Sequence, residues 1–438
     1  MIKASPRDGG LGPKIKTLLN SGVVWLILSQ LIVQTAGVVG VKVLTNALSR
    51  HEFGYFALGT SMAGAVSVLI FGPLGQVVFR YYSICQQRGI LSAYHFTLIK
   101  FHLILGACLA ATAILGAISL PVRYLHYQLG FFAGSLVGIC ASIQIYFNAR
   151  QIRSAVGKIQ SFESIIKYAF PIAVVFFIAR EGTSALFAFV GAELLAVAFA
   201  IRILWKYHVP EISTPQVDTR GLKKEFLKFG LPFLSFSFIS MSYAYGDRWI
   251  LDFYWASADV AEYAVLYQIA FAPSALVLGV LSQIFLPKIY SALSKEQIMI
   301  KNLESALVLR RTATRLLVVG AFFSTIIAFL LGEFLVRFFS STSYIQHAGW
   351  LWVLVLGHYL ISYTQLASSI GFGLNKPNMY TMPKLLQLIS VMSSASVLVP
   401  EYGVQGVIVV FLIGAVVNVL VTEYLNFRLL RTVIRKSF

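Results

Sequence analysis

Twelve long apolar runs, separated by short polar gaps, account for almost the whole chain. A helix needs about 20 apolar residues to cross the hydrocarbon of a bilayer, and each run is close to that length. The runs predict an all-α, polytopic membrane protein with twelve membrane-spanning helices. Their predicted bounds are residues 22–45, 53–79, 96–120, 128–148, 162–180, 183–204, 229–251, 260–287, 310–335, 348–373, 380–399 and 403–427.

Basic residues fall in every second gap between these runs. Seven short stretches hold 28 of the 35 Lys and Arg residues. Cytoplasmic loops of membrane proteins are enriched in Lys and Arg, so we predict that both termini are cytoplasmic. A basic protein that binds nucleic acid gathers its charge on one solvated surface, whereas this chain spreads a net charge of +18 along one face of a membrane. We therefore expect the bilayer, and no nucleic acid, as a partner.

The chain matches itself at a shift of 208 residues. Gly54-Tyr55-Phe56-Ala57-Leu58 aligns with Glu262-Tyr263-Ala264-Val265-Leu266, and Arg80-Tyr81-Tyr82-Ser83 aligns with Lys288-Ile289-Tyr290-Ser291. Six segments separate the copies, which predicts a parallel repeat with a substrate site between the halves. Chance similarity between apolar segments is the alternative. The predicted domains are a cytoplasmic segment (1–21), two six-helix bundles (22–204 and 229–427), a cytoplasmic linker (205–228) and a basic tail (428–438).

Catalytic and metal-binding patterns are absent from the sequence. The three cysteines form neither a disulfide framework nor a metal-ligand spacing. No nucleophile–base constellation or carboxylate cluster is apparent, and the outer loops are short. We expect no cofactor, no metal and no enzyme activity. A membrane polymerase or ligase, which would place reactive residues on a large outer loop, is the rival from another class.

Two stretches resemble a known family. VLTNALSRHEFGYFALGTSMAGAVSVLIFGPLGQVVFRYYS (43–83) is similar to the N-terminal signature of the polysaccharide flippases, which export lipid-linked oligosaccharides and belong to the multidrug/oligosaccharidyl-lipid/polysaccharide exporter superfamily. FGLPFLSFSFISMSYAYGDRWILDFYWASADVAEYAVLYQIA (229–270) resembles the family at the start of the second half. A departure is Arg50-His51-Glu52, where the family more often has a Gly-Pro turn.

The resemblance implies both a fold and a function. The fold would be two six-helix bundles around a central cavity that opens alternately to each side. The function would be to move an undecaprenyl-diphosphate-linked oligosaccharide, an O-antigen or exopolysaccharide repeat unit, from the cytoplasmic to the periplasmic leaflet of the bacterial inner membrane. A proton or sodium ion is a candidate coupling ion, and a polysaccharide polymerase is a candidate partner.

Ionisable residues inside membrane segments are costly and therefore point to function. Lys42 and Arg248 lie toward the periplasmic ends of their segments, against the orientation bias, and a cationic cavity would suit a diphosphate. Asp247 and Arg248 are neighbours and should point about 100° apart, so each is expected to pair elsewhere. The candidate substrate-binding residues are Lys42, Asp247, Arg248 and Arg80. For Asp247 the alternative is a structural ion pair, and for Arg80 it is a snorkelling side chain at a helix end.

Glu193 and His358 lie near the bilayer centre and are the candidate ion-coupling residues. A carboxylate at that depth needs a proton, a cation or a hydrogen-bond donor. The alternative for Glu193 is a protonated side chain bonded to a neighbouring helix, and for His358 it is packing among aromatic residues. Three further functions stay open: a multidrug or cation antiporter of the same superfamily, a peptidoglycan-precursor flippase, which usually has two more helices, and a non-transporting scaffold.

Overall fold

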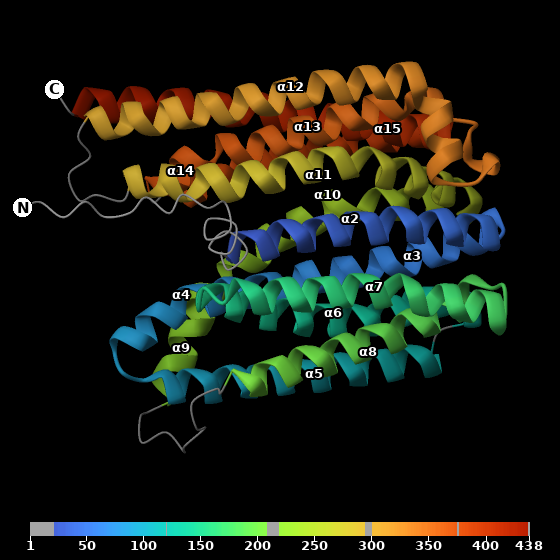
Figure 1. Cartoon of the computed structure of the whole chain (residues 1–438), viewed down its shortest axis with the longest axis horizontal. Coiled ribbons are helices and arrows are strands. Elements are labelled where there is room, and N and C mark those ends of the chain that lie inside the picture. The colour runs from blue at the N-terminus through green and yellow to red at the C-terminus, as the bar shows by residue number, and fades with distance from the viewer. Residues whose placement is uncertain (1–21, 120, 208–218, 294–299, 375, 437–438) are drawn as a thin grey trace, which may run out of the picture.

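The computed structural model describes residues 22–119, 121–207, 219–293, 300–374 and 376–436, and throughout these it contains helices and no strand. Figure 1 shows the helices side by side in one elongated bundle. The first half holds α2 (Gly22–Ala47), α3 (Arg50–Val66), α4 (Gly72–Gln87), α5 (Leu91–Ser119), α6 (Leu125–Ala149), α7 (Arg153–Phe177) and α8 (Gly182–Lys206). After α9 (Thr219–Gly230), the second half holds α10 (Pro232–Tyr254), α11 (Ser257–Leu293), α12 (Ile300–Phe339), α13 (Leu351–Ala367), α14 (Ser369–Gly373) and α15 (Thr381–Lys436).

The prediction of twelve membrane crossings is confirmed. Ten helices among the described residues are long and apolar enough to span a bilayer. The last of these crosses twice, because α15 turns at Gly403, whose φ of +53° suits a residue without a Cβ. The twelfth crossing is α10, whose 23 residues extend about 35 Å at 1.5 Å per residue.

The outer surface of the bundle is that of a membrane protein. Large apolar side chains of α5 and α12 are widely exposed, among them Ile118 (78%) and Leu330 (68%). Exposed apolar surface on this scale would not be stable in water. The chain is therefore a multi-pass membrane protein, with polar contacts turned toward the interior.

The helix bounds follow the sequence repeat. Adding 208 to the first residues of α2, α3 and α5 gives 230, 258 and 299, each within two residues of the start of α10, α11 and α12. One difference between the halves is a five-residue π-helix, Ser67–Phe71, which separates α3 from α4 just before Pro73. Proline lacks a backbone donor, so the ladder of hydrogen bonds is interrupted here.

Part of the predicted polar linker is a helix. α9 lies across the bundle, close to α4 and α5, at the end where α2 begins and α15 ends (Figure 1). We call this end the α9 end and the other the far end. The predicted tail is also largely helical, because α15 continues to Lys436. The predicted N-terminal segment 1–21, linker residues 208–218 and residues 437–438 lie outside the described residues.

The two halves are joined at the far end and enclose a cavity between them toward the α9 end. At the far end, Arg50 of α3 forms an ion pair of 2.7 Å with Glu262 of α11, and the Tyr127 hydroxyl donates to Asp252 at 2.7 Å. A Cβ added to Gly54 would lie 1.9 Å from the backbone oxygen of Ser257, so only glycine permits this approach of α3 to α11. Toward the α9 end, a cavity of about 750 Å³ lies between α4, α6 and α7 of one half and α11 of the other.

Candidate functional site

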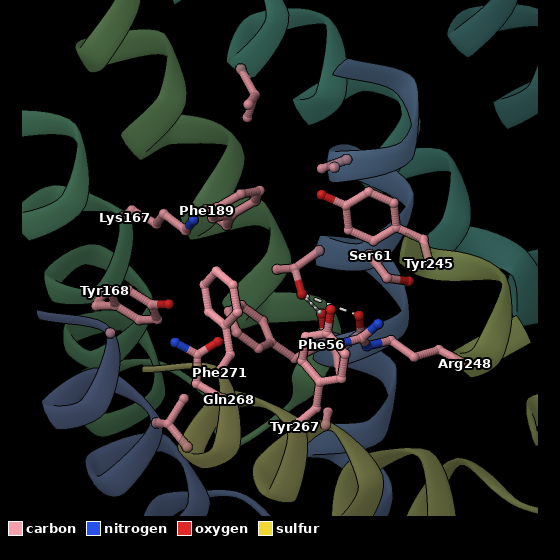
Figure 2. Close-up of a pocket in the computed structure, with 18 of the residues that line it drawn as sticks. Phe56, Ser61, Lys167, Tyr168, Phe189, Tyr245, Arg248, Tyr267, Gln268 and Phe271 are labelled. Atoms are coloured by element: carbon pink, nitrogen blue, oxygen red, sulfur yellow. Dashed lines mark hydrogen bonds between the residues drawn. The ribbon is translucent and has the colours of Figure 1, made fainter. Parts of the chain in front are cut away.

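A second cavity, of about 440 Å³, lies between the halves in the middle of the bundle. Helices α2, α3, α7 and α8 of the first half and α10 and α11 of the second provide most of its wall. Figure 2 shows its side chains converging from both halves. Most of them are aromatic or uncharged polar, including Phe56, Ser61, Tyr168, Phe189, Tyr245, Tyr267, Gln268 and Phe271. We call this space the central cavity.

Small residues of α2 and α3 admit the aromatic rings that shape the cavity. A Cβ on Gly40 would lie 2.2 Å from the ring of Tyr168, and a Cβ on Gly64 would lie 2.4 Å from the ring of Tyr245. Larger residues at these positions would push the rings away, because packed interiors leave no spare space. The two glycines thus set where Tyr168 and Tyr245 stand.

Arg248 brings a positive charge to the cavity from α10. Only 8% of the residue is exposed. Its guanidinium donates to the carbonyl of Ala244 at 3.2 Å and lies 4.4 Å from the centre of the Tyr267 ring. Figure 2 shows the side chain reaching toward Tyr267 and Ser61 in the middle of the view. The predicted place of Arg248 between the halves is where the structure puts it.

The prediction that Asp247 and Arg248 pair elsewhere and not with each other is wrong. Arg248 Nη1 donates to Asp247 Oδ1 at 3.1 Å, and the other oxygen of Asp247 accepts from the Tyr263 hydroxyl. An arginine side chain is long enough to fold back over the preceding turn, so the angle between adjacent helical positions does not prevent the pair. Asp247 does not line the cavity; it positions the guanidinium from behind.

Lys167 of α7 is a second cation of the central cavity, although the sequence pattern did not indicate it. The predicted segment began at residue 162, which placed Lys167 near a membrane surface. The helix in fact begins at Arg153, so Lys167 lies 14 residues, or about 21 Å, along it. In Figure 2 Lys167 and Arg248 approach the cavity from opposite sides. Among the described lining residues there are these two cations and no carboxylate.

A polar cluster lies behind Lys167 inside the first half. Glu193 of α8 is buried, and neither of its carboxylate oxygens has a hydrogen-bond partner within the described residues. Glu163 of α7 accepts from Gln144 Nε2 at 2.7 Å and from the Cys140 thiol at 3.4 Å. Glu193 lies within electrostatic range of both Glu163 and Lys167. Glu163 escaped the sequence analysis for the same reason as Lys167.

The other predicted site residues lie outside the central cavity. The Lys42 ammonium donates to the backbone carbonyls of Arg337, at 2.7 Å, and Ser340. It therefore satisfies the last carbonyls of α12 at the far end, a usual place for a basic side chain, and the expectation that it faces the cavity is not met. Arg80 is exposed on α4, 4.3 Å from the ring centre of Phe229. His358 packs among Tyr267, Phe271 and Phe411, with ring centres 4.5–5.4 Å away.

No group of three or more His, Cys, Asp and Glu side chains in the described part of the chain could hold a metal ion. Cationic side chains, aromatic rings and side-chain amides make up the central cavity. These groups can bind an anion that is joined to a polar, ring-containing group.

Solved structures of membrane transporters share this fold. The lipid II flippase MurJ in an inward closed conformation is 15% identical, with a TM-score of 0.65, over 92% of this chain and 86% of that one. An inward-facing multidrug resistance MATE family transporter of the MOP superfamily is 15% identical, with a TM-score of 0.62, over 94% and 96%. A MOP superfamily transporter from Pyrococcus furiosus, described as having a binding pocket of reverse polarity, is 15% identical, with a TM-score of 0.57, over 93% and 95%.

The fold is thus that of the MOP superfamily transporters, which confirms the predicted fold class. None of the curated protein sequences matches the chain. A family profile does: residues 19–292, more than half of the chain, match the family described as polysaccharide biosynthesis protein, and the chain belongs to that family.

Proposed function

We propose that this protein is a flippase, not an enzyme, that carries an undecaprenyl-diphosphate-linked oligosaccharide repeat unit from the cytoplasmic to the periplasmic leaflet of the bacterial inner membrane. The central cavity's charge is the observation that supports this most. Lys167 and Arg248 line it, and no described carboxylate does. A guanidinium can bind phosphate oxygens through two parallel hydrogen bonds, and an ammonium adds a point charge. The substrate's diphosphate is the group that these two cations would hold.

The rest of the wall suits the sugar part of such a substrate. Aromatic rings of Phe56, Tyr245 and Phe271 pack well against the C–H faces of sugar rings. The side chains of Gln34 and Gln268 offer donors and acceptors for hydroxyl groups. Few of these groups would distinguish one sugar from another. The repeat unit, from an O-antigen or an exopolysaccharide, would therefore be selected by its size and charge.

Alternating access follows from the way the halves meet. The far-end contacts, including Arg50 with Glu262, join the halves on that side, while a cavity of 750 Å³ separates α4 and α6 from α11 toward the α9 end. With cytoplasmic termini, as the basic gaps predict, the α9 end and its cavity would face the cytoplasm. Breaking the far-end contacts and bringing α4 and α6 against α11 would expose the same site to the periplasm.

Glu193 is proposed to bind the coupling ion, a proton or sodium. Its carboxylate is buried without a described partner and interacts electrostatically with Lys167. Neutralising Glu193 would change the charge balance at the cavity wall, which links ion binding to the affinity for an anion. His358 remains a second candidate, close behind the wall residues Tyr267 and Phe271.

Transport in liposomes tests the proposal. Lipid-linked oligosaccharide with a fluorescent sugar is placed in one leaflet, and its arrival in the other is followed with a membrane-impermeant quencher. Arg248→Gln and Lys167→Gln should each lower transport efficiency by about tenfold to a hundredfold, the value of a hydrogen bond to a charged group. Arg202→Gln and Lys158→Gln alter exposed bases on α8 and α7 and serve as matched controls. Wild-type rates in both cavity variants, or export of organic cations instead, would overturn the proposal.

A further inference from the structure

Helix α9 is a short amphipathic helix fixed to the first half. Its apolar side chains Leu222 and Phe226 are buried, the latter against the rings of Tyr81 and Tyr94. Glu225 forms an ion pair of 3.2 Å with Arg88 at the end of α4. Helices with one apolar and one basic face lie in the membrane interface. The position of α9 across the ends of α4 and α5 agrees with this (Figure 1).

An apolar groove of about 310 Å³ begins at α9 and runs along α4 and α5. α4 contributes Pro73 and Val77, α5 contributes Ile104, α9 contributes Leu227, and α10 contributes Leu234. No charged residue lines it among those described. Ile104, Leu227 and Leu234 are 63%, 46% and 41% exposed, so the groove opens to the lipid. It extends from Ile70 in the π-helix to Val77 of α4, a distance of seven residue steps or about 10 Å.

Basic side chains stand at the mouth of this groove. Lys224 and Lys228 are exposed, lie one turn apart on α9, and flank Leu227. Arg80 follows Val77 by three positions, so it lies on the groove side of α4, toward the membrane surface. The groove therefore offers an apolar slot with two or three cations at its polar end.

The groove also lies on the seam between the two halves. A Cβ on Gly72 would be 2.9 Å from the Ser237 hydroxyl, so α4 approaches α10 closely here, right after the π-helix Ser67–Phe71. The neighbouring residues Gly75 and Gln76 of α4 line the 750 Å³ cavity that leads toward the α9 end. One helix thus separates the lipid-facing groove from the polar interior.

We infer that this groove holds the isoprenoid chain of a polyprenyl-diphosphate substrate while Lys224 and Lys228 contact its diphosphate, before the contact of α4 with α10 opens to admit the sugar part. This rests on the proposed function. An isoprenoid chain cannot follow an oligosaccharide into a cavity lined by Lys167 and Arg248, because apolar surface is stable only away from water and charge. It needs a slot that faces the lipid and adjoins the interior, and the groove has both properties.

A second apolar cavity gives an internal comparison. It has about the same volume, 340 Å³, but α4, α5, α6 and α8 of the first half alone line it. Unlike the groove, it has no residue of the basic helix α9 among its described lining residues. Ile99, 41% exposed, lines that cavity, and Ile104 lines the groove, both on α5. Ile104→Trp and Ile99→Trp therefore fill two similar spaces, of which only one is proposed to bind substrate.

Photocrosslinking tests occupancy directly. A polyprenyl diphosphate without sugar, carrying a diazirine in its chain, is added to the protein in nanodiscs of phosphatidylethanolamine and phosphatidylglycerol. Adducts are expected on α4, α5 and α10 around the groove, and Ile104→Trp should reduce them at least fivefold while Ile99→Trp does not. Unlabelled polyprenyl diphosphate should compete, and phosphatidylglycerol in equal amount should not. Equal competition would show annular lipid only and would overturn the inference.

Transport separates this inference from the proposed function. Wild-type protein should flip lipid-linked oligosaccharides with long and short isoprenoid chains. Ile104→Trp should raise the KM for the long-chain substrate about tenfold, because the isoprenoid chain would lose the burial of roughly two methylene groups. The KM for the short-chain substrate should not change. No transport by wild type would defeat the proposed function. Normal wild-type transport with an unchanged long-chain KM in both Ile104→Trp and the pair Lys224→Gln, Lys228→Gln would defeat the groove alone.

Discussion

Replacing Arg50 with methionine should open the far end of the protein. Methionine keeps the apolar stem of the side chain but removes the guanidinium that pairs with Glu262 at 2.7 Å. The Glu262 side chain is fully buried, whereas 29% of the Arg50 side chain is exposed. Breaking a fully buried pair costs about 3–5 kcal/mol. Glu262 retains the backbone N–H of His347 at 2.8 Å, and water reaches Arg50, so we expect about 2 kcal/mol here.

The ion pair stabilises only one conformation of the protein. The pair joins the two halves, so it stabilises the state in which the far end is closed and vanishes when the halves separate there. A loss of about 2 kcal/mol raises the ratio of far-end-open to far-end-closed molecules about 30-fold. Spin labels at Glu181 and Thr342, exposed positions in the far-end loops of the two halves, report that ratio as a change in their distance distribution.

The control is Arg123→Gln, which alters another exposed far-end arginine, one that stacks on Tyr124 within its own half. Its distance distribution should equal that of wild type. Equal distributions in Arg50→Met and wild type, with both proteins folded, would refute the reasoning that the ion pair holds the halves together. A lower unfolding temperature without a longer distance would assign the pair to fold stability alone.

Three further outcomes are expected. Single cysteines at Arg220 and Ala256 should react with impermeant reagents only from the cytoplasm and only from the periplasm, respectively; cytoplasmic labelling of residue 256 would reverse the topology. Gly403→Ala should destabilise the protein by about 1–2 kcal/mol, because φ is +53° and the Trp255 ring lies 3.1 Å from the new Cβ; thermal unfolding in detergent measures this, with Gly246→Ala, in open space, as the control. A diphosphate carrying about two charges gains roughly 5 kcal/mol from a 100 mV potential, so transport should depend on the sign of a potassium-diffusion potential, and identical rates for both signs would contradict it.

The periodicity of the sequence was sufficient for the fold. Apolar runs, base-rich gaps and the shift of 208 residues predict twelve crossings and a repeated pair of bundles, because the bilayer imposes length and polarity on every helix. The helix within the linker was not foreseen. α9 is mostly polar, and its buried apolar side chains Leu222 and Phe226, one turn apart, indicate a face that packs.

The site was only partly predictable, since depth in the membrane was inferred from segment bounds. Glu193 lies well inside its helix by both the predicted and the observed bounds, whereas Arg248 was selected because its charge runs against the orientation bias. Lys167 and Glu163 gained depth only when α7 proved to begin at Arg153, nine residues before the predicted bound. Lys42 could not be placed for a different reason. Its depth in the membrane does not indicate the direction of its side chain, which points to the carbonyls of α12.

The Arg50 contact has a meaning for the internal duplication. At the shift of 208 residues, Arg50 is equivalent to Ala258 and Gly54 is equivalent to Glu262. The Arg50 side chain donates to both Ala258 and Glu262, across the axis that relates the two halves. In a symmetric dimer of six-helix subunits every such contact would occur twice. Here one copy is an ion pair, and its mate is the approach of Gly54 to the Ser257 backbone, beside which the Ser257 hydroxyl donates to the backbone carbonyl of His51 at 3.4 Å. Because both halves belong to one chain, one flank can hold the ion pair of Arg50 with Glu262 while the other holds the hydrogen bonds of Ser257 to His51. This difference in strength favours separation by tilting about the ion-paired flank over moving straight apart.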